Sequence, residues 1–232
     1  MIRFHGVCYS YRPSEPVLRG VNVQIPTGLT LLVGPNGCGK STLLKLAAGV
    51  ERPDRGSVEI EGRDLWREEI AARRDFSFVP EQPDLTPYAT IMDILRLVCR
   101  LRGEPVERGR LALESAGLKG LSNRSIRELS MGQRRRAALA AAWIGSPRVV
   151  LLDEPLEAMD RAMREQILAW IERLLDREAS VVIATHEIEP FISKAARAIT
   201  VKEGLCIFRD PLPDEAGKRA ELLESLSRGQ NA

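Results

Sequence analysis

The stretch GPNGCGKST, residues 34 to 42, has the residue types and spacing of a loop that holds phosphate groups. Glycines let successive backbone N–H groups curl around phosphate oxygens, and a helix that follows presents its positive end to the same anion. In this pattern the lysine reaches the outer phosphates of a nucleotide and the serine hydroxyl contacts Mg²⁺. The predicted nucleotide-binding residues are Gly34, Asn36, Gly37, Cys38, Gly39, Lys40, Ser41 and Thr42, with Ser41 also a metal ligand.

Two acids and a histidine follow later apolar runs and could complete a hydrolytic site. Asp153 and Glu154 come directly after VVLL, and His186 comes shortly after VVIA. An aspartate at the end of a buried strand can hold Mg²⁺ through its water shell, and the adjacent glutamate can polarise a water in line with the outermost phosphate. We therefore predict that Asp153 contacts the metal and that Glu154 is the catalytic base.

These residues share a position in the chain, because each follows a short apolar run. The runs are TLLVG at 30 to 34, FSFV at 76 to 79, VVLL at 149 to 152, VVIA at 181 to 184 and AITV at 198 to 201. Continuous apolar runs are typical of strands buried on both faces of a parallel sheet, and helical patterns such as 162 to 177 separate them. Since ligands bind outside the carboxyl ends of such strands, the sequence predicts an α/β fold with the chemistry along one sheet edge.

Two parts of the chain depart from this alternation. Residues 1–28 and 56–62 alternate with a period of two, which predicts an antiparallel β flap beside the main, mostly parallel sheet. Residues from about 86 to 145 carry helical periodicity, which predicts an inserted helical lobe. We expect one domain over residues 1–210 and an amphipathic helical tail over 211–232.

The composition of the chain limits which partners and which cellular compartment can be expected. The formal net charge is +2, from 34 Lys and Arg against 32 Asp and Glu, so no nucleic-acid partner is expected. Four widely spaced cysteines without CxxC pairs fit a reducing compartment. The N-terminus shows no signal pattern, and no apolar stretch approaches the roughly 20 residues of a spanning helix. A cytoplasmic location is expected.

Four motifs together resemble the nucleotide-binding domains of ATP-binding-cassette (ABC) ATPases, which are built on a P-loop NTPase core. They are GPNGCGKST, LSMGQ at 129 to 133, VVLLDEP at 149 to 155 and ATH at 184 to 186. The resemblance covers roughly the first 210 residues. It implies a two-lobed fold and a dimer that sandwiches two ATP molecules, with each LSMGQ facing the nucleotide of the other subunit. The partner would be a second ABC ATPase subunit, either a copy of this chain or a relative.

The resemblance also implies roles for residues outside the phosphate loop. The LSMGQ residues Ser130, Met131, Gly132 and Gln133 would grip a γ-phosphate across the dimer, although Met131 replaces a glycine of the usual motif. His186 would hydrogen-bond the γ-phosphate, Asp160 would reach the partner's loop, and Tyr11 would stack on adenine. Either Glu81 or Gln82, in VPEQPDL, would contact the metal or the attacking water.

ATP and Mg²⁺ are therefore the expected cofactors, and ATP hydrolysis is the expected activity. We interpret the chain as the ATPase subunit of a transporter, held at the inner face of the cell membrane by separate integral membrane permease subunits. The short length, the EQP spelling and the compact arm resemble those of exporter-type subunits, which makes an exporter the expectation. The alternative is a soluble ABC ATPase, such as an Fe–S assembly ATPase. The basic trio Arg134 to Arg136 is interpreted as a solvated helix face.

Overall fold

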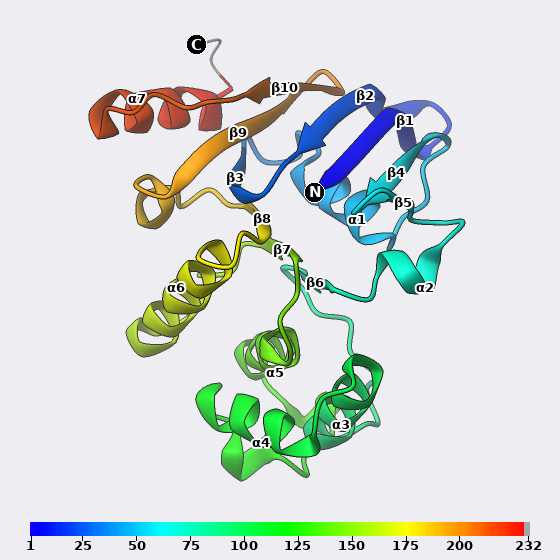
Figure 1. Ribbon diagram of the computed structural model, residues 1–232, viewed down its shortest axis with the longest axis vertical. Helices are drawn as coiled ribbons and strands as arrows, with labels where there is room; N and C mark the ends of the chain where they lie inside the picture. Colours follow the sequence, from blue (N-terminus) through cyan, green and yellow to red (C-terminus); the bar gives the residue numbers. More distant parts are fainter. Residues whose placement is uncertain (230–232) are drawn as a thin grey trace.

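The computed structural model describes residues 1–229, and its centre is a six-stranded sheet (Figure 1). The strand order is β10-β9-β3-β8-β7-β6, and all neighbouring pairs are parallel except β9 and β10. The five predicted runs form β3 (Gly28–Val33), β6 (Phe76–Val79), β7 (Val149–Asp153), β8 (Ser180–Ala184) and β9 (Ala195–Lys202). The predicted α/β fold with a mostly parallel sheet is confirmed. The antiparallel edge strand β10 (Leu205–Arg209) was not predicted.

A second, antiparallel sheet forms the predicted flap. It contains β1 (Ile2–Arg12), β2 (Glu15–Ile25), β4 (Arg55–Ile60) and β5 (Arg63–Asp64) in the order β2-β1-β4-β5. Alternate residues of β1 and β4 point inward, and they share one apolar cluster with α1 (Lys40–Ala48). The flap therefore helps to bury the helix that follows the phosphate loop.

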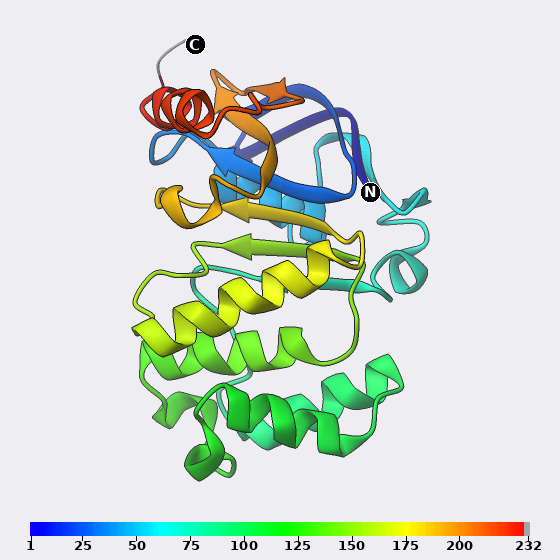
Figure 2. The same cartoon turned by 60° about the vertical axis from the view of Figure 1, so that its left-hand side comes forward.

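The main sheet is buried on both faces, which explains why its strands are continuously apolar. In β7, Val149 and Leu151 pack toward α1 and the flap, whereas Val150 and Leu152 pack into a second cluster. That cluster contains side chains of α5 (Met131–Trp143), α6 (Arg161–Leu175) and α7 (Ala216–Ser227). Figure 2 shows these layers. Packing on both faces therefore fixes the sheet, and the sheet in turn fixes where the loops at its strand ends begin.

Helices α3 (Ile91–Arg102) and α4 (Val106–Ser115) lie beyond the β6 edge, at the lower end of Figure 1, with α5 between them and the sheet. Helix α3 begins with a capping box between Thr90 and Asp93. Within residues 1–229, the remaining elements are the short helix α2 (Glu69–Ala72) and three 3₁₀ turns, at Lys119–Leu121, Ile126–Glu128 and Glu189–Phe191. The domain boundary at 210 and the tail over 211–232 stay predictions, and residues 230–232 of that tail lie outside the described residues.

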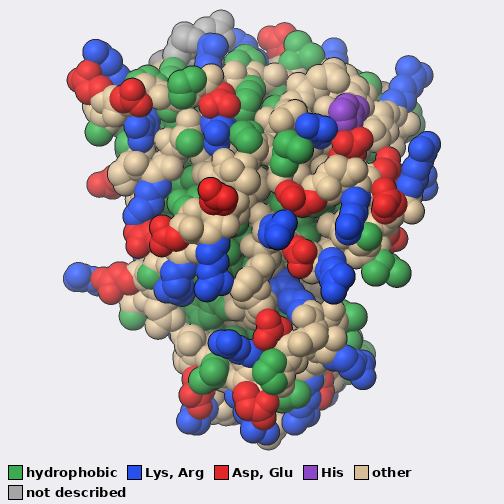
Figure 3. All heavy atoms as spheres, viewed as in Figure 1, with side chains coloured by type: hydrophobic (Ala, Val, Ile, Leu, Met, Phe, Trp, Pro, Cys, Tyr) green, Lys and Arg blue, Asp and Glu red, His purple; other side chains and the backbone are tan. Residues whose placement is uncertain are grey.

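On the face shown in Figure 3, basic and acidic side chains are interspersed. All four cysteines are free thiols. Within residues 1–229, none of the helices has both the length and the apolar character that a membrane span requires.

Arg102 joins the distal helices to the sheet. Its guanidinium, at the end of α3, donates to the carbonyl oxygen of Phe76 at 3.1 Å and to Ser77 Oγ at 2.7 Å in β6, and also to the carbonyl oxygen of Ile144 after α5. Burial lowers the pKa of this group. One half-buried cation therefore donates to acceptors in two other elements, and its loss would remove a charged donor from them.

We predict that Arg102→Met lowers the free energy of unfolding by about 2–3 kcal/mol, because partly buried acceptors lose a charged donor. Urea denaturation of the purified protein measures this change. Arg100→Met is the matched control, since Arg100 is exposed on the same helix, and it should change stability by less than about 0.5 kcal/mol. Equal effects of the two substitutions would contradict the assigned role of Arg102.

Candidate active site

The predicted phosphate loop joins β3 to α1 and depends on glycine at three positions. Gly34, Gly37 and Gly39 have φ angles of +145°, +78° and +116°, a region that other residues rarely adopt. A Cβ on Gly34 would lie 3.0 Å from Cys38 Sγ, so that position is also too crowded for a side chain. The loop leads directly into α1, whose first N–H groups have no acceptor within the helix.

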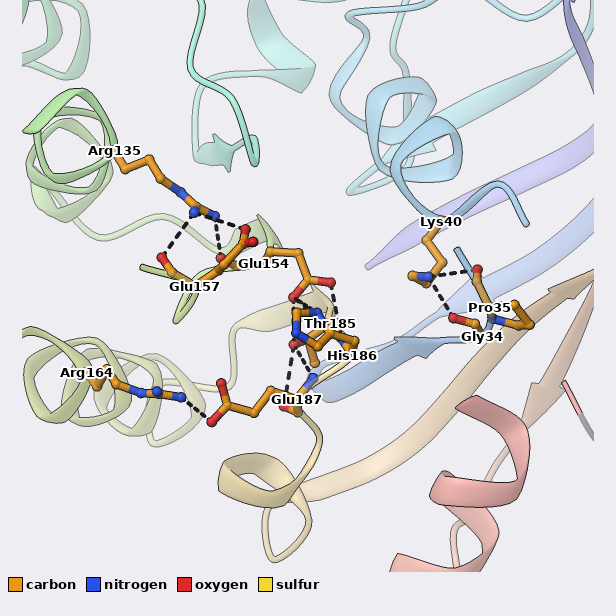
Figure 4. A network of polar contacts seen from close by, with 10 residues as sticks. All are labelled: Gly34, Pro35, Lys40, Arg135, Glu154, Glu157, Arg164, Thr185, His186 and Glu187. Atoms are coloured by element: carbon orange, nitrogen blue, oxygen red, sulfur yellow. Dashed lines mark hydrogen bonds and ion pairs between the residues drawn. The ribbon is translucent and has the colours of Figure 1, made fainter. Parts of the chain in front are cut away.

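Lys40 is held beneath this loop. Its side chain is only 8% exposed, and its Nζ donates to the carbonyl oxygens of Gly34 at 2.7 Å and Pro35 at 3.0 Å (Figure 4). The ammonium thus closes the turn of the loop and stays at its inner side. This places one positive charge and a set of backbone donors at the carboxyl end of β3.

The other predicted loop residues span a range of exposure. Asn36 and Gly37 are exposed at the tip, Cys38 and Ser41 are half-buried, and Thr42 is buried. Tyr11 is 53% exposed, and its hydroxyl lies 3.2 Å from Thr42 Oγ1. Tyr9 is buried edge-on against Tyr11 and donates to Glu51, so the Tyr11 ring is the one that offers a free face beside the loop.

Asp153 ends β7 in a buried position beside the loop. Burial raises the pKa of its carboxyl to about 6, the negative charges of Glu81 and Glu154 act in the same direction, and a hydrogen bond from Ser41 opposes the shift. No cluster of three or more His, Cys, Asp or Glu side chains within residues 1–229 is arranged to hold a metal. Mg²⁺ is commonly held by one or two carboxylates together with substrate phosphates. The hard oxygens of Ser41 and Asp153, with the acids around them, fit that chemistry.

Glu81 and Gln82 are separated by the structure. Glu81 is half-buried and close enough to Asp153 for its charge to raise the pKa of that group. Gln82 is exposed. The geometry therefore favours Glu81 as the residue of this pair that faces the metal position.

Glu154 has an unusual backbone and a well-defined carboxylate. Its φ of +48° lies in the left-handed region, and its N–H donates to the carbonyl oxygen of Ala184 at 2.8 Å. The carboxylate accepts from Thr185 Oγ1 at 3.0 Å and from the backbone N–H of His186 at 3.1 Å. His186 Nδ1 lies 3.0 Å from the same carboxylate. The structure thus brings the predicted base and the predicted γ-phosphate residue into direct contact.

The pKa of His186 is raised above its ordinary value, chiefly by this hydrogen bond to Glu154 and by the charge of the same carboxylate. Glu157 and Glu187 add weaker effects in the same direction, and slight burial opposes them. Since the folded-state pKa is raised, the contact stabilises the protein most below the unfolded-state pKa of 6.5. That contribution is lost as the pH rises through the folded-state value.

The LSMGQ segment forms the first turn of α5. Ser130 is the N-cap, its hydroxyl accepts from the Gln133 N–H at 3.3 Å, and Gln133 Oε1 accepts from the Ser130 N–H at 2.9 Å. Met131 is exposed, and a Cβ on Gly132 would meet no atom within 4 Å. The two side chains of the capping box therefore shape a helix N-terminus that faces open space, as an anion site shared with another molecule requires.

Asp160 is the N-cap of α6. Its carboxylate accepts from the Met163 N–H at 2.9 Å and from Arg136 at 2.5 Å. The predicted contact of Asp160 with a partner subunit stays a prediction, because the structure gives this carboxylate two partners within its own chain.

The interpretation of the basic trio as a solvated helix face is wrong for its middle member. Arg135 is 6% exposed, and its guanidinium lies against Glu154 and Glu157 (Figure 4). Helical spacing could have predicted this burial, since Arg135 lies three and four residues before the buried Ala138 and Leu139 and so on the same face of the helix. Sequence reasoning also missed Arg164 of α6, which forms an ion pair with Glu187 next to His186.

Residues 18–157 match the family model described as ABC transporter. Among curated proteins, the sulfate/thiosulfate import ATP-binding protein CysA of Synechocystis is 37% identical over 193 residues, which are 81% of this chain and 54% of that protein. The aliphatic sulfonates import ATP-binding protein SsuB of Pseudomonas fluorescens is 37% identical over 82% of this chain and 70% of its own length. The chain spans about half the length of the CysA proteins that it matches.

Solved structures give the same result for the fold. The dimeric structure of the ATP-binding cassette MJ0796 bound to ADP and Pi has a TM-score of 0.78 and 26% identity over 90% of this chain and 98% of that one. A bacterial Atm1-family ABC exporter with ATP bound has a TM-score of 0.76 and covers 96% of this chain and 39% of that chain. At 20% identity, the exporter shows a likeness of fold alone.

We predict that the imidazole of His186 titrates with a pKa above 6.5 and that Glu154→Gln lowers this value. The physical reason is that a neutral amide stabilises the imidazolium less than a carboxylate does. Proton NMR of the imidazole signals measures the titration, and His5→Gln assigns the two histidines. A His186 midpoint at or below 6.5, or one that Glu154→Gln leaves unchanged, would contradict the contact.

Proposed function

This chain belongs to the ABC transporter family, and we propose that it is the ATP-binding and hydrolysing subunit of a transporter whose membrane-spanning subunits are separate chains. One observation carries the proposal. The phosphate loop with Lys40, the buried Asp153 and the Glu154–His186 pair follow three adjacent parallel strands at a single sheet edge. That arrangement brings together an anion cradle, a metal ligand and a general base.

In the proposed reaction, the loop N–H groups and Lys40 bind the β- and γ-phosphates of ATP. Ser41, Asp153 and Glu81 would hold Mg²⁺, which neutralises phosphate charge when it is bound. Glu154 accepts a proton from a water whose oxygen attacks the γ-phosphorus, and the bond between that phosphorus and the bridging oxygen breaks to give ADP and phosphate. His186, anchored to Glu154 through Nδ1, hydrogen-bonds the γ-phosphate, and Tyr11 stacks on the adenine.

We propose that the active form is a dimer with a second ABC ATPase subunit. The open N-terminus of α5 offers backbone donors to an anion on another molecule, so ATP held by one subunit can be gripped by the LSMGQ turn of the other. The dimeric MJ0796 cassette supports this proposal by analogy. ATP then acts as the adhesive between the subunits, and hydrolysis releases them.

The transporter role is supported by the relatives, which are named import ATP-binding proteins. These names count against the predicted exporter type, which stays a prediction. They also favour a transporter over the alternative of a soluble Fe–S assembly ATPase. In the proposed setting, the chain is cytoplasmic and is held at the inner face of the membrane by its permease partners.

We predict that Glu154→Gln retains ATP binding but lowers the rate of ATP hydrolysis by about 100-fold or more, because general-base catalysis contributes about 10²–10⁴. Steady-state phosphate release measures turnover, and a fluorescent ATP analogue measures binding. Arg173→Gln, an exposed residue on α6, is the matched control and should hydrolyse ATP like the wild type. Undiminished turnover in Glu154→Gln would exclude Glu154 as the base.

We predict that the tagged chain, expressed in its native host and purified from mildly solubilised membranes, recovers a multispanning membrane protein. Mass spectrometry identifies the co-purified chains, and the tag alone is the control. Recovery only from the soluble fraction, together with Fe–S assembly proteins, would overturn the transporter role and leave the ATPase mechanism in place.

A further inference from the structure

Arg135 is a charged residue buried between α5 and the segment that follows β7. It lies in the second turn of α5, and its guanidinium donates to the Glu154 carbonyl oxygen at 2.7 Å, to the Glu157 carbonyl oxygen at 3.0 Å and to Glu157 Oε2 at 3.1 Å (Figure 4). Two of these three bonds go to backbone oxygens in the segment that follows β7. A simple ion pair with Glu157 would need only the third bond, and the Glu157 side chain is itself 46% exposed.

The bond to the Glu154 carbonyl acts on a strained residue. A non-glycine residue at φ +48° persists only where its surroundings fix it. The N–H of Glu154 is fixed by Ala184 of β8, and its carbonyl oxygen is fixed by Arg135 of α5. Because both peptide groups are held, the direction of the Cα–Cβ bond of Glu154 is set. From this direction the carboxylate reaches Thr185 and His186.

The helix that carries Arg135 also carries the LSMGQ turn. Ser130 caps α5, and Arg135 follows five residues later, which corresponds to about 7.5 Å along the axis at about 1.5 Å per residue. A displacement of this turn therefore moves the guanidinium, because the two belong to one continuous helix. The same displacement acts on the backbone of Glu154.

We propose that Arg135 is a positioning residue that holds the Glu154 carboxylate in its catalytic orientation and ties it to the LSMGQ turn of the same subunit. The proposal rests on the proposed function, in which Glu154 is the base. Arg135 itself contacts neither the phosphate loop nor Asp153 in any hydrogen bond of the described residues. Its effect on turnover must therefore pass through Glu154.

A double-mutant cycle tests this path. Arg135→Gln should lower kcat for ATP hydrolysis by about tenfold or more while KM changes less than about twofold, and it should have no further effect in the Glu154→Gln background. Arg135→Lys keeps the charge but lacks the planar fork, so it provides the same cycle if the glutamine variant does not fold. Thermal unfolding of every variant verifies the fold.

Two matched variants distinguish a positioning role of Arg135 from a general role in the stability of the fold. Arg134→Gln removes the neighbouring arginine, whose hydrogen bonds within residues 1–229 go to backbone oxygens of Ile126 and Arg127 in the distal helical region. It should leave kcat near the wild-type value. Glu157→Gln removes the carboxylate partner of Arg135 but keeps both backbone bonds. It should therefore also retain most of the turnover.

A measurement without nucleotide gives an independent readout. The His186 imidazole faces Glu154, Glu157 and Glu187, and its raised pKa depends chiefly on Glu154. When Arg135→Gln releases the Glu154 backbone, the NMR-measured pKa of His186 should fall toward 6.5. Arg134→Gln should leave it unchanged.

The outcomes are distinct. A folded Arg135 variant with wild-type kcat and an unchanged His186 pKa would overturn the proposal, as would equal losses of turnover in the wild-type and Glu154→Gln backgrounds. A loss in Glu157→Gln as large as that in Arg135→Gln would assign the effect to the ion pair instead. If the wild type fails to hydrolyse ATP, or if Glu154→Gln retains full turnover, the proposed function fails on its own, whatever Arg135 does.

Discussion

The backbone of Glu154 is the constraint on which the rest of the site depends. Glu154 lies directly after β7 in a left-handed conformation, and hydrogen bonds with two other segments, α5 and the carboxyl end of β8, hold it there. Thr185 and His186, which follow β8, contact the Glu154 carboxylate, and Arg135 of α5 contacts its carbonyl oxygen. A carboxylate with fewer anchors would sample other orientations, and a base must lie within hydrogen-bond reach of the proton that it removes.

The sheet makes this convergence possible. Because β3, β8 and β7 are adjacent and parallel, the phosphate loop, the His186 segment and the two acids emerge at the same edge. Close-packed apolar clusters on both faces of the sheet fix the positions of these strand ends relative to one another. The helices on one face also bring in residues from far along the chain. In this way α5 joins the LSMGQ turn to the carboxylate of Glu154, which we propose to be the catalytic base.

Motifs and apolar runs predicted much of this architecture, since Lys40, Asp153 and His186 lie next to the strands that position them. The sequence was a weaker guide to which of several adjacent side chains lies in the site. Glu81 and Gln82 differ by one position, and only the folded loop shows that Glu81 is half-buried, with its charge raising the pKa of Asp153, whereas Gln82 is exposed. The charge of Arg135 predicts a solvated side chain, whereas its helical spacing from the buried Ala138 and Leu139 indicates a buried one. A buried cation is stable only with acceptors that the sequence alone does not place.

The central claim is that ATP joins the phosphate loop of one subunit to the LSMGQ turn of another. Sedimentation velocity of the Glu154→Gln protein, with and without saturating ATP, tests it most directly, because slow hydrolysis preserves the bound state. We expect a monomer without ATP and a dimer with ATP. We also expect that Ser130→Arg in the same background binds ATP but remains monomeric. A protein that stays monomeric at saturating ATP, or a dimer that Ser130→Arg does not weaken, would contradict the claim.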